Sequence, residues 1–130
     1  MRRRVGHGLI ILMTFMVPCI LVANPDNTDQ EIQHLLAYIA EAKCRFIRNG
    51  KEYGPEAARK HIQKKYEYAR KRIKTDEDFI QGVASKSSIS GKVYMVRCND
   101  QIMLCADWLG VELQRFRQKA QTAGDPHSEQ

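Results

Sequence analysis

The sequence predicts a small α+β domain in which about four helices surround a short antiparallel sheet, with one disulfide bond. Apolar residues recur at helical spacing in several separate segments, which indicates amphipathic helices. An Asn49-Gly50 pair and a β-prone run that ends at Cys98 predict short strands. Residues 24–120 have the length of one small domain, and no internal repeat divides them.

Residues 1–23 have the layout of a secretory signal peptide. Three arginines, Arg2–Arg4, precede a run from Leu9 to Ala23 that contains no charged residue. This run is about 15 residues long, shorter than the roughly 20 that a membrane-spanning helix needs. We therefore expect cleavage after Ala23 and a periplasmic domain. The alternative is an uncleaved signal that anchors the protein in the inner membrane, because Leu21 is larger than signal peptidases prefer.

The net charge of the domain is modest. The chain has 21 basic and 15 acidic residues, a formal net charge of +6. Removal of the three signal arginines reduces 21 basic residues to 18 against the same 15 acids, which halves the charge to +3. We therefore expect no nucleic-acid partner.

The first half of the domain contains predicted helices around a hairpin. Residues 28–31 have the form of a capping box and precede an apolar stripe, which predicts a helix over residues 29–43. Asn49-Gly50 predicts a tight hairpin between residues 45–48 and 51–53. Gly54-Pro55 then starts a second helix. Its narrow apolar stripe consists of Ala58, Ile62, Tyr66, Ala69 and Ile73.

The second half begins with Thr75, which precedes three acidic residues and starts a short third helix. Phe79, Ile80 and Val83 form its buried side. Residues 85–91 are a serine-rich loop, and residues 93–98 and 102–104 are short strands joined by a turn at Asn99-Asp100. A last helix covers residues 106–119, with Trp108, Leu109, Leu113 and Phe116 facing inward, and residues 121–130 form a disordered tail.

Three cysteines follow the signal, and an oxidising compartment predicts one bond between them. A Cys44–Cys98 bond closes a loop of about 55 residues, worth about 4 kcal/mol in the chain-entropy description. A Cys98–Cys105 bond closes about 8 residues and is worth about 2.5 kcal/mol. We favour the longer bridge because it ties the first part of the domain to its last strands. Cys105 is then a free thiol.

The second helix is strongly cationic, and its flank is a candidate anion- or partner-binding site. His61 and Lys65 recur at helical spacing with Tyr68 and Arg72, so a carboxylate or phosphate could bind along this flank. The alternatives are a solvated charged face and a boundary histidine hydrogen-bonded beside the core. The helix lacks the broad apolar face needed for membrane insertion. The candidate residues are His61, Lys64, Lys65, Lys71 and Arg72.

The serine-rich loop and the free thiol are weaker candidates. Ser87, Ser88 and Ser90 could form a loop site for an anion or glycan, but they also suit a turn whose hydroxyls cap backbone groups. Neither S-x-x-K nor G-x-S-x-G is present. Cys105 begins the last helix, where the helix dipole lowers a thiol pKa. We identify no catalytic residue, metal site or cofactor, and Cys98 and Cys105 lack zinc-finger spacing.

Five motifs along the domain carry a resemblance to a known family: Cys44-x-Phe46-Ile47-Arg48-Asn49-Gly50, His61-x-x-x-Lys65-Tyr66, Arg72-Ile73-Lys74-Thr75, Ala84-Ser85-x-Ser87-Ser88-x-Ser90-Gly91 and Asp107-Trp108-Leu109. Together they resemble the YfeK-like family of small exported proteins from Gram-negative bacteria, a domain of unknown function. The resemblance implies a periplasmic protein and supports pairing Cys44 with Cys98, but it implies no activity. Cys105 departs from the small helix-capping residue, such as serine, that the family pattern leads us to expect.

The sequence therefore predicts a non-enzymatic cell-envelope binding or interaction module that uses its cationic helix. The expected partner is another envelope protein or an anionic envelope component, and the sequence does not indicate an oligomeric state. The alternative is a small envelope hydrolase or thiol enzyme that uses the serine-rich loop, His61 or Cys105.

Overall fold

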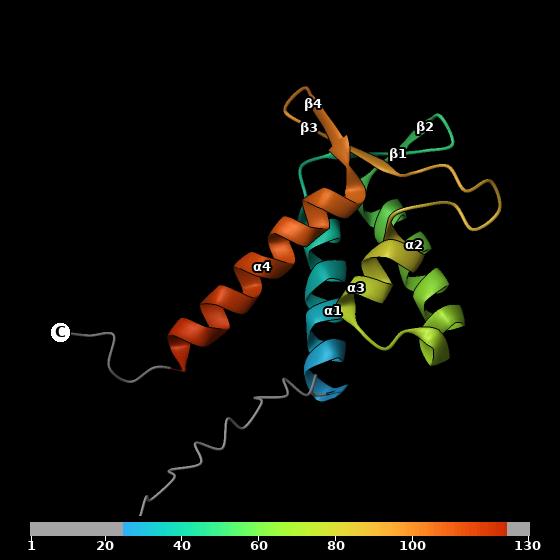
Figure 1. Cartoon of the computed structure of the whole chain (residues 1–130). Helices are drawn as coiled ribbons and strands as arrows, with labels where there is room; N and C mark the ends of the chain where they lie inside the picture. The colour runs from blue at the N-terminus through green and yellow to red at the C-terminus, as the bar shows by residue number, and fades with distance from the viewer. Residues whose placement is uncertain (1–24, 125–130) are drawn as a thin grey trace, which may run out of the picture.

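A computed structural model of the chain describes residues 25–124, in which helices pack beneath a four-stranded antiparallel sheet (Figure 1). The predicted α+β class is confirmed. The sheet lies at one end of the helices, and α1 (Pro25–Glu41) is packed between α2 (Pro55–Ala69) and α4 (Cys105–Ala123). The predicted signal peptide and residues 125–130 lie outside the described residues.

Two hairpins placed side by side make the sheet. β1 (Arg45–Arg48) pairs with β2 (Lys51–Tyr53), and β3 (Met95–Cys98) pairs with β4 (Gln101–Leu104), in the order β2-β1-β3-β4. Both turns have two residues at positive φ, Asn49 and Gly50 in one and Asn99 and Asp100 in the other. This geometry matches the twist of the flanking strands, so the predicted turns are confirmed.

The disulfide bond joins the two central strands across the sheet. Cys44 precedes β1 and bonds to Cys98 at the end of β3, with the two Cα atoms 4.6 Å apart. The predicted pairing is therefore confirmed, and Cys105 is free and buried. The bond holds together the start of β1 and the end of β3, two segments far apart in the sequence.

The helical boundaries correct two predictions. α1 begins at Pro25, so Thr28 lies within the helix and the predicted capping box at residues 28–31 is wrong. Proline suits the first helical turn because its missing N–H has no partner there in any case. At the other end of the described residues, α4 continues to Ala123, beyond the predicted end of the last helix at residue 119.

The short third helix starts as predicted. Thr75 and Asp78 form a reciprocal capping box at α3 (Asp76–Phe79), and the chain continues through the π-helical turn η2 (Ile80–Ala84). Phe79, Ile80 and Val83 are buried as expected. This segment packs against α2 and α4, while the 3₁₀ turn η1 (Arg70–Arg72) ends α2.

The core lies where the helices meet one face of the sheet. Ile32, Leu35 and Ile39 of α1 are fully buried together with Leu109 of α4. Val96 of β3 contributes the sheet's side of the same core. None of the helices in residues 25–124 has the combination of length and hydropathy that a bilayer crossing requires.

Candidate functional site

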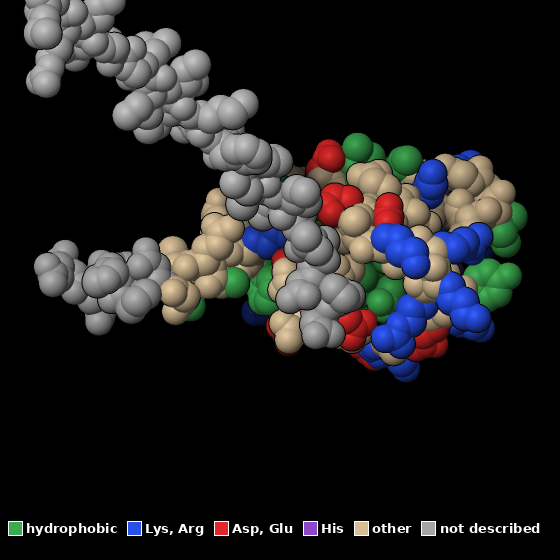
Figure 2. Space-filling view, turned by 60° about the horizontal axis from the view of Figure 1, so that its bottom comes forward, with side chains coloured by type: hydrophobic (Ala, Val, Ile, Leu, Met, Phe, Trp, Pro, Cys, Tyr) green, Lys and Arg blue, Asp and Glu red, His purple; other side chains and the backbone are tan. Residues whose placement is uncertain are grey.

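A cationic groove runs along α2, beneath the β1–β2 turn and the serine-rich loop. Lys and Arg side chains also gather on the side of the molecule where α2 and η1 lie (Figure 2). None of the residues that line the groove is Asp or Glu. The groove is open to solvent, and its main lining residues are Arg48, His61, Lys64, Lys65, Tyr68, Arg72, Ser87, Ser88 and Tyr94.

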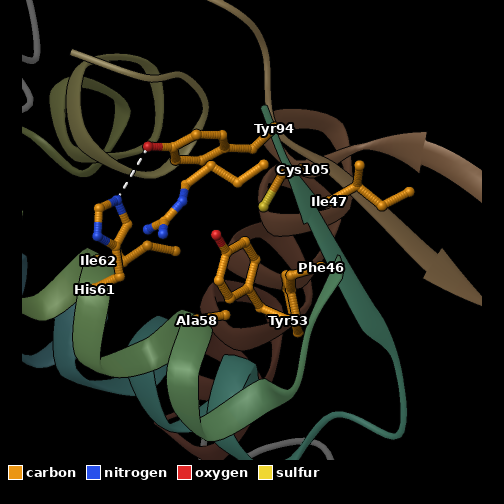
Figure 3. A pocket seen from close by; sticks show the side chains of 9 residues that line it. Phe46, Ile47, Tyr53, Ala58, His61, Ile62, Tyr94 and Cys105 are labelled. Atoms are coloured by element: carbon orange, nitrogen blue, oxygen red, sulfur yellow. Dashed lines mark hydrogen bonds between the residues drawn. The ribbon is translucent and has the colours of Figure 1, made fainter. Parts of the chain in front are cut away.

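His61 occupies the middle of the groove on α2, with its Nε2 atom 3.2 Å from the Tyr94 hydroxyl (Figure 3). Burial lowers the pKa of His61, and the positive charges of Arg48, Lys65 and Lys64 lower it further. The imidazole is therefore neutral at neutral pH. It fits the description of a boundary histidine hydrogen-bonded beside the core, but it also lies where an added anion would meet several cations.

Lys65 has a structural role within the groove. Its ammonium donates hydrogen bonds to the backbone carbonyls of Val83 at 2.7 Å and Lys86 at 2.6 Å. It also lies 3.4 Å from the hydroxyl of Tyr94 and 5.0 Å from that residue's ring centroid. Burial lowers the pKa of Lys65, with smaller contributions from Arg48 and Lys86. Lys65 thus fixes the start of the serine-rich loop to α2.

Arg48 is a groove residue that the sequence analysis did not identify as a site. It lies on β1 and, because side chains alternate along a strand, faces the same side as the buried Phe46. Its guanidinium stacks over the ring of Tyr53 at 4.4 Å from the centroid. Within the described residues it has no ion-pair partner. Strand alternation was the signal that could have found it.

Of the three candidate serines in the loop, Ser87 and Ser90 make structural hydrogen bonds through their hydroxyls, whereas the Ser88 hydroxyl makes none within the described residues. The Ser87 hydroxyl accepts hydrogen bonds from the backbone N–H groups of Ile89 and Ser90, at 3.4 and 3.2 Å. The Ser90 hydroxyl donates to Asn49 at 2.8 Å and so ties the loop to the β1–β2 turn. Ser88 is exposed and lines the groove. These contacts match the predicted role of the hydroxyls in capping backbone groups.

The structure brings together most of the predicted anion-binding residues. Lys64 and Arg72 line the same groove as His61 and Lys65, and Ser88 lies on its other side. Lys71 is exposed on η1 and does not line the groove. The two candidate sites that the sequence presented separately, the helix flank and the serine-rich loop, are thus opposite walls of one groove.

An apolar slot opens beside the groove and ends at Cys105 (Figure 3). The Cys105 side chain is fully buried, and burial raises the pKa of its thiol to about 12. The expectation of a thiol pKa lowered by the helix dipole is therefore wrong, since loss of water contact outweighs the dipole. A thiol in this environment is not an activated nucleophile.

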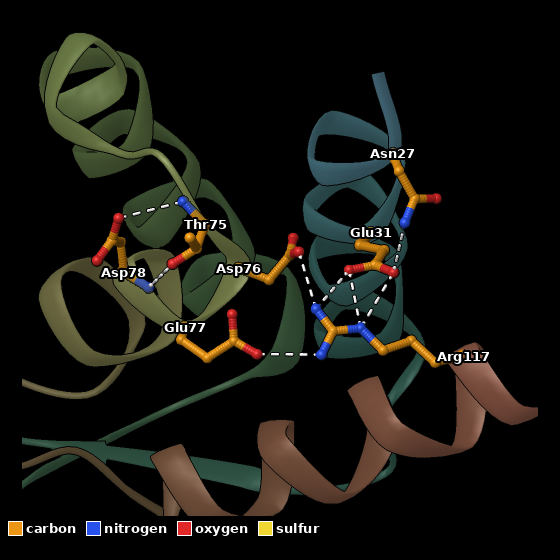
Figure 4. Close-up of polar contacts among 7 residues, drawn as sticks. All are labelled: Asn27, Glu31, Thr75, Asp76, Glu77, Asp78 and Arg117. Atoms are coloured by element: carbon orange, nitrogen blue, oxygen red, sulfur yellow. Dashed lines mark hydrogen bonds and ion pairs between the residues drawn. The ribbon is translucent and has the colours of Figure 1, made fainter. Parts of the chain in front are cut away.

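A second charged cluster, centred on Arg117, lies between α1, α3 and α4 (Figure 4). Arg117 forms ion pairs with Glu31 at 2.9 Å, Asp76 at 3.1 Å and Glu77 at 3.0 Å. Glu31 and Asp76 are buried. Burial and the neighbouring Glu31 raise the pKa of Asp76 to about 7. Hydrogen bonds from Arg117 lower the pKa of Glu31, despite the opposing effect of burial.

The described residues offer no obvious metal centre. Residues 25–124 contain no cluster of three or more His, Cys, Asp or Glu side chains arranged to hold a metal ion. The chemistry available at the groove is therefore that of guanidinium, ammonium, imidazole and hydroxyl groups. These groups suit the binding of an anion.

The chain belongs to a family of unknown function, DUF5329, whose model matches residues 26–117. Over 69 residues it is 41% identical to the uncharacterized protein YfeK of Salmonella typhimurium. The match spans 52% of this chain and 58% of the length of that relative. The resemblance to YfeK is thus confirmed, and the family brings no established activity. No solved structure matches the chain.

Proposed function

We propose that the protein is a non-enzymatic binding module of the bacterial cell envelope, and that its cationic groove binds an anionic group of an envelope component or partner protein. One observation carries this proposal. Arg48 of β1 and Lys64 and Lys65 of α2 lie close to the neutral His61, with no carboxylate among the lining residues to neutralise these cations. Cations held together without a counter-charge favour an external anion.

Two further features support binding at this place. Lys65 and Ser90 hold the serine-rich loop against α2 and the β1–β2 turn, so the groove is formed before any ligand arrives. A preformed site loses less conformational freedom on binding. The proposed periplasmic location rests on the layout of residues 1–23 and on the Cys44–Cys98 bond, which is typical of oxidising compartments.

The enzymatic alternative receives less support from the same geometry. Cys105 is buried with a raised pKa, and the hydroxyls of Ser87 and Ser90 are engaged with the loop itself. Ser88 is exposed, but the His61 side chain contacts the Tyr94 hydroxyl rather than a serine. A nucleophile needs a base within hydrogen-bond reach, and the described residues present no such pair here.

The test is a titration of the purified protein with inorganic phosphate at low salt, followed by NMR. We expect saturable shifts confined to the groove, and their loss at high ionic strength. Arg48→Glu should weaken binding at least tenfold, whereas Lys71→Glu, the same charge reversal outside the groove, should have a much smaller effect. Equal weakening by the two variants, or shifts spread over the whole surface, would show that the groove is not a specific site.

A further inference from the structure

The cationic groove consists of two adjoining cavities that share their central residues. The first has a volume of about 370 Å³ and the second a volume of about 450 Å³, and both volumes lie within the range of small-molecule pockets. His61, Lys65 and Ser88 line both cavities. The groove is therefore long enough for a ligand that occupies the two cavities together, rather than only for a single small anion.

Each cavity has cations of its own. Arg48 lines the first cavity but not the second, whereas Lys64 and Arg72 line the second but not the first. Lys64 and Arg72 are four positions before and after Tyr68. Tyr68 lies seven positions beyond His61, about 10 Å along the helix. Within the described residues no Asp or Glu lines either cavity, so the groove offers two separate places for negative charge.

The stretch between these two places presents mainly uncharged hydrogen-bonding groups. The imidazole of His61 is neutral and contacts the Tyr94 hydroxyl (Figure 3). The exposed Ser88 hydroxyl makes no hydrogen bond in the part of the chain that the structure describes. The ammonium of Lys65 is already engaged with two backbone carbonyls. Imidazole and hydroxyl groups donate and accept hydrogen bonds, so this stretch suits a ligand whose middle carries hydroxyl groups.

Tyr68 adds an aromatic surface to the second cavity. The residue is 87% exposed and lines the cavity between Lys64 and Arg72. The face of an aromatic ring carries partial negative charge and attracts the C–H groups on the flat side of a sugar ring. An exposed tyrosine between two cations therefore suits a sugar ring that carries an anionic group.

We propose that the groove binds a saccharide that carries two phosphate groups, one in each cavity. One phosphate pairs with Arg48, and the other pairs with Lys64 and Arg72, through charge-assisted hydrogen bonds. The hydroxyl groups of the sugar contact His61 and Ser88. This inference rests on the proposed function, since it names the class of anion that the groove receives.

The first experiment compares ligands that differ in phosphate spacing and in hydroxyl groups. The purified protein is titrated by NMR at constant ionic strength with inorganic phosphate, pyrophosphate, hexane-1,6-diol bisphosphate and glucose 1,6-bisphosphate. Joining two groups that bind at the same time raises affinity, but only if the link spans both places. We expect both six-carbon bisphosphates to bind more than about tenfold tighter than pyrophosphate, whose phosphates are adjacent. The glucose ligand should bind about two- to tenfold tighter than the hexanediol ligand.

Variants test the two ends and the middle of the site separately. Arg48→Gln and Arg72→Gln should each remove the advantage of the six-carbon bisphosphates over pyrophosphate. Lys71→Gln is the matched control, because Lys71 is the exposed neighbour of Arg72 and does not line the groove. Ser88→Ala should weaken the glucose ligand about two- to tenfold and leave the hexanediol ligand unchanged. Arg72 and Ser88 are exposed, so these two changes test the site without disturbing the core.

The outcomes distinguish the two proposals. Six-carbon bisphosphates that bind no tighter than pyrophosphate would overturn the two-phosphate ligand but leave the anion-binding groove intact. Equal affinities for the glucose and hexanediol ligands would overturn the saccharide class. Tighter binding of a tetrapeptide with glutamate at each end would do the same and would indicate an acidic segment of a protein. No binding of any of these anions, phosphate included, would overturn both proposals.

A last measurement identifies the source of the saccharide. The protein is sedimented with vesicles of phosphatidylcholine that contain a bisphosphorylated glycolipid, and with vesicles of phosphatidylcholine alone. Co-sedimentation with the first vesicles only, lost in Arg72→Gln, would assign the saccharide to a lipid headgroup. Binding of glucose 1,6-bisphosphate without co-sedimentation would assign it to a soluble sugar.

Discussion

The Arg117 cluster and the cationic groove both contain arginine, but the arginines differ in whether the fold supplies them with carboxylate partners. Arg117 meets three carboxylates, two of them buried, and holds three helices together (Figure 4). Arg48 belongs to a groove whose lining residues include no carboxylate. This comparison indicates that the number of charged residues in a segment does not determine whether those residues stabilise the fold or are available to a ligand. A charged side chain that has an oppositely charged partner within the fold contributes to stability, whereas one without such a partner is available to bind a ligand.

The physical basis of the contrast is desolvation. A charge removed from water is costly unless a partner and hydrogen bonds replace the lost hydration. The Arg117 cluster meets this requirement internally, although the Oδ1 atom of Asp76 has no hydrogen-bond partner among the described residues. The groove keeps its cations half-exposed or exposed, so water can take the place of a partner. Changes to the first cluster should therefore affect folding, and changes to the second should affect binding.

The largest expected effect follows from Arg117→Leu. This change leaves Glu31 and Asp76 buried without their cation, and removal of one partner of a buried ion pair typically costs about 3–5 kcal/mol. The free energy of unfolding is measured by urea denaturation. Arg59→Leu removes an arginine whose partner Glu56 is exposed, and it should change stability little. Similar losses in the two variants would abolish the distinction between internal and surface pairs.

The next effect concerns the pH dependence that Asp76 gives to stability. Its pKa is about 7 in the folded protein against an ordinary value of 3.8, so between these values the folded state alone retains the proton. The free energy of unfolding then falls as pH rises from about 4 to about 7. The amide side chain of the Asp76→Asn variant cannot ionise. Between pH 4 and pH 7 the free energy of unfolding of this variant should therefore rise by about 2–4 kcal/mol relative to that of the wild type.

Urea denaturation at pH 4.5 and pH 8 tests this prediction. Glu77→Gln is the matched control, because Glu77 also pairs with Arg117 but is exposed. The lowered pKa of Glu31 acts in the opposite direction, with stability rising as the pH rises, and it is present in all the proteins compared. A parallel pH profile for wild type and Asp76→Asn would rule out Asp76 as the group that titrates.

A smaller loss of stability is expected from Lys65→Met. Lys65 lines the groove, but its contacts give it a structural role, so the variant tests whether a groove cation can act on stability. The change deprives two backbone carbonyls, those of Val83 and Lys86, of a charged donor. We expect a loss of about 2 kcal/mol and faster amide hydrogen exchange in residues 85–91. Lys64→Met, the adjacent lysine without such contacts, should leave both quantities unchanged. Slow exchange retained in Lys65→Met would contradict this assignment.

The smallest expected effect is a rise in the pKa of His61 when the groove is occupied. Burial and the nearby cations lower this pKa in the free protein. A bound anion offsets the cations and favours the imidazolium, so phosphate should bind more tightly at pH 5.5 than at pH 7.5 after allowance for the charge of phosphate itself. NMR titration of the ring protons measures the shift. An unchanged pKa in the presence of saturating phosphate would place the anion away from His61.

Much of the fold could be predicted because it depends on neighbours in the sequence. Asn49-Gly50 formed its turn and Gly54-Pro55 began α2, as expected. Thr75 capped α3 through a residue three positions away. The failure at Thr28 has the same local character: Pro25 is an equally good helix start, and a pattern cannot choose between two compatible beginnings.

The candidate site was only partly predictable. The spacing of His61 and Lys65 placed both residues on α2. Arg72 lies beyond the end of that helix, on the turn η1, but it lines the same groove. The contribution of Arg48 and the opposition of the serine-rich loop depend on how β1 and the chain before β3 pack against α2. No spacing within a segment contains that information.

By itself the sequence determined the helices, the hairpin turns, the apolar stripes and the candidate cations, because each follows from residues a few positions apart. The tertiary structure alone decided which charges are paired. Arg117 meets Glu31 across 86 positions of the chain, while Arg48 and His61 come together without a carboxylate beside them. The tertiary structure also buries Cys105. The position of this thiol at the start of a helix would lower its pKa, but burial raises the pKa to about 12. The reason is that burial and ion pairing depend on distances in space, which the packing of the whole domain sets.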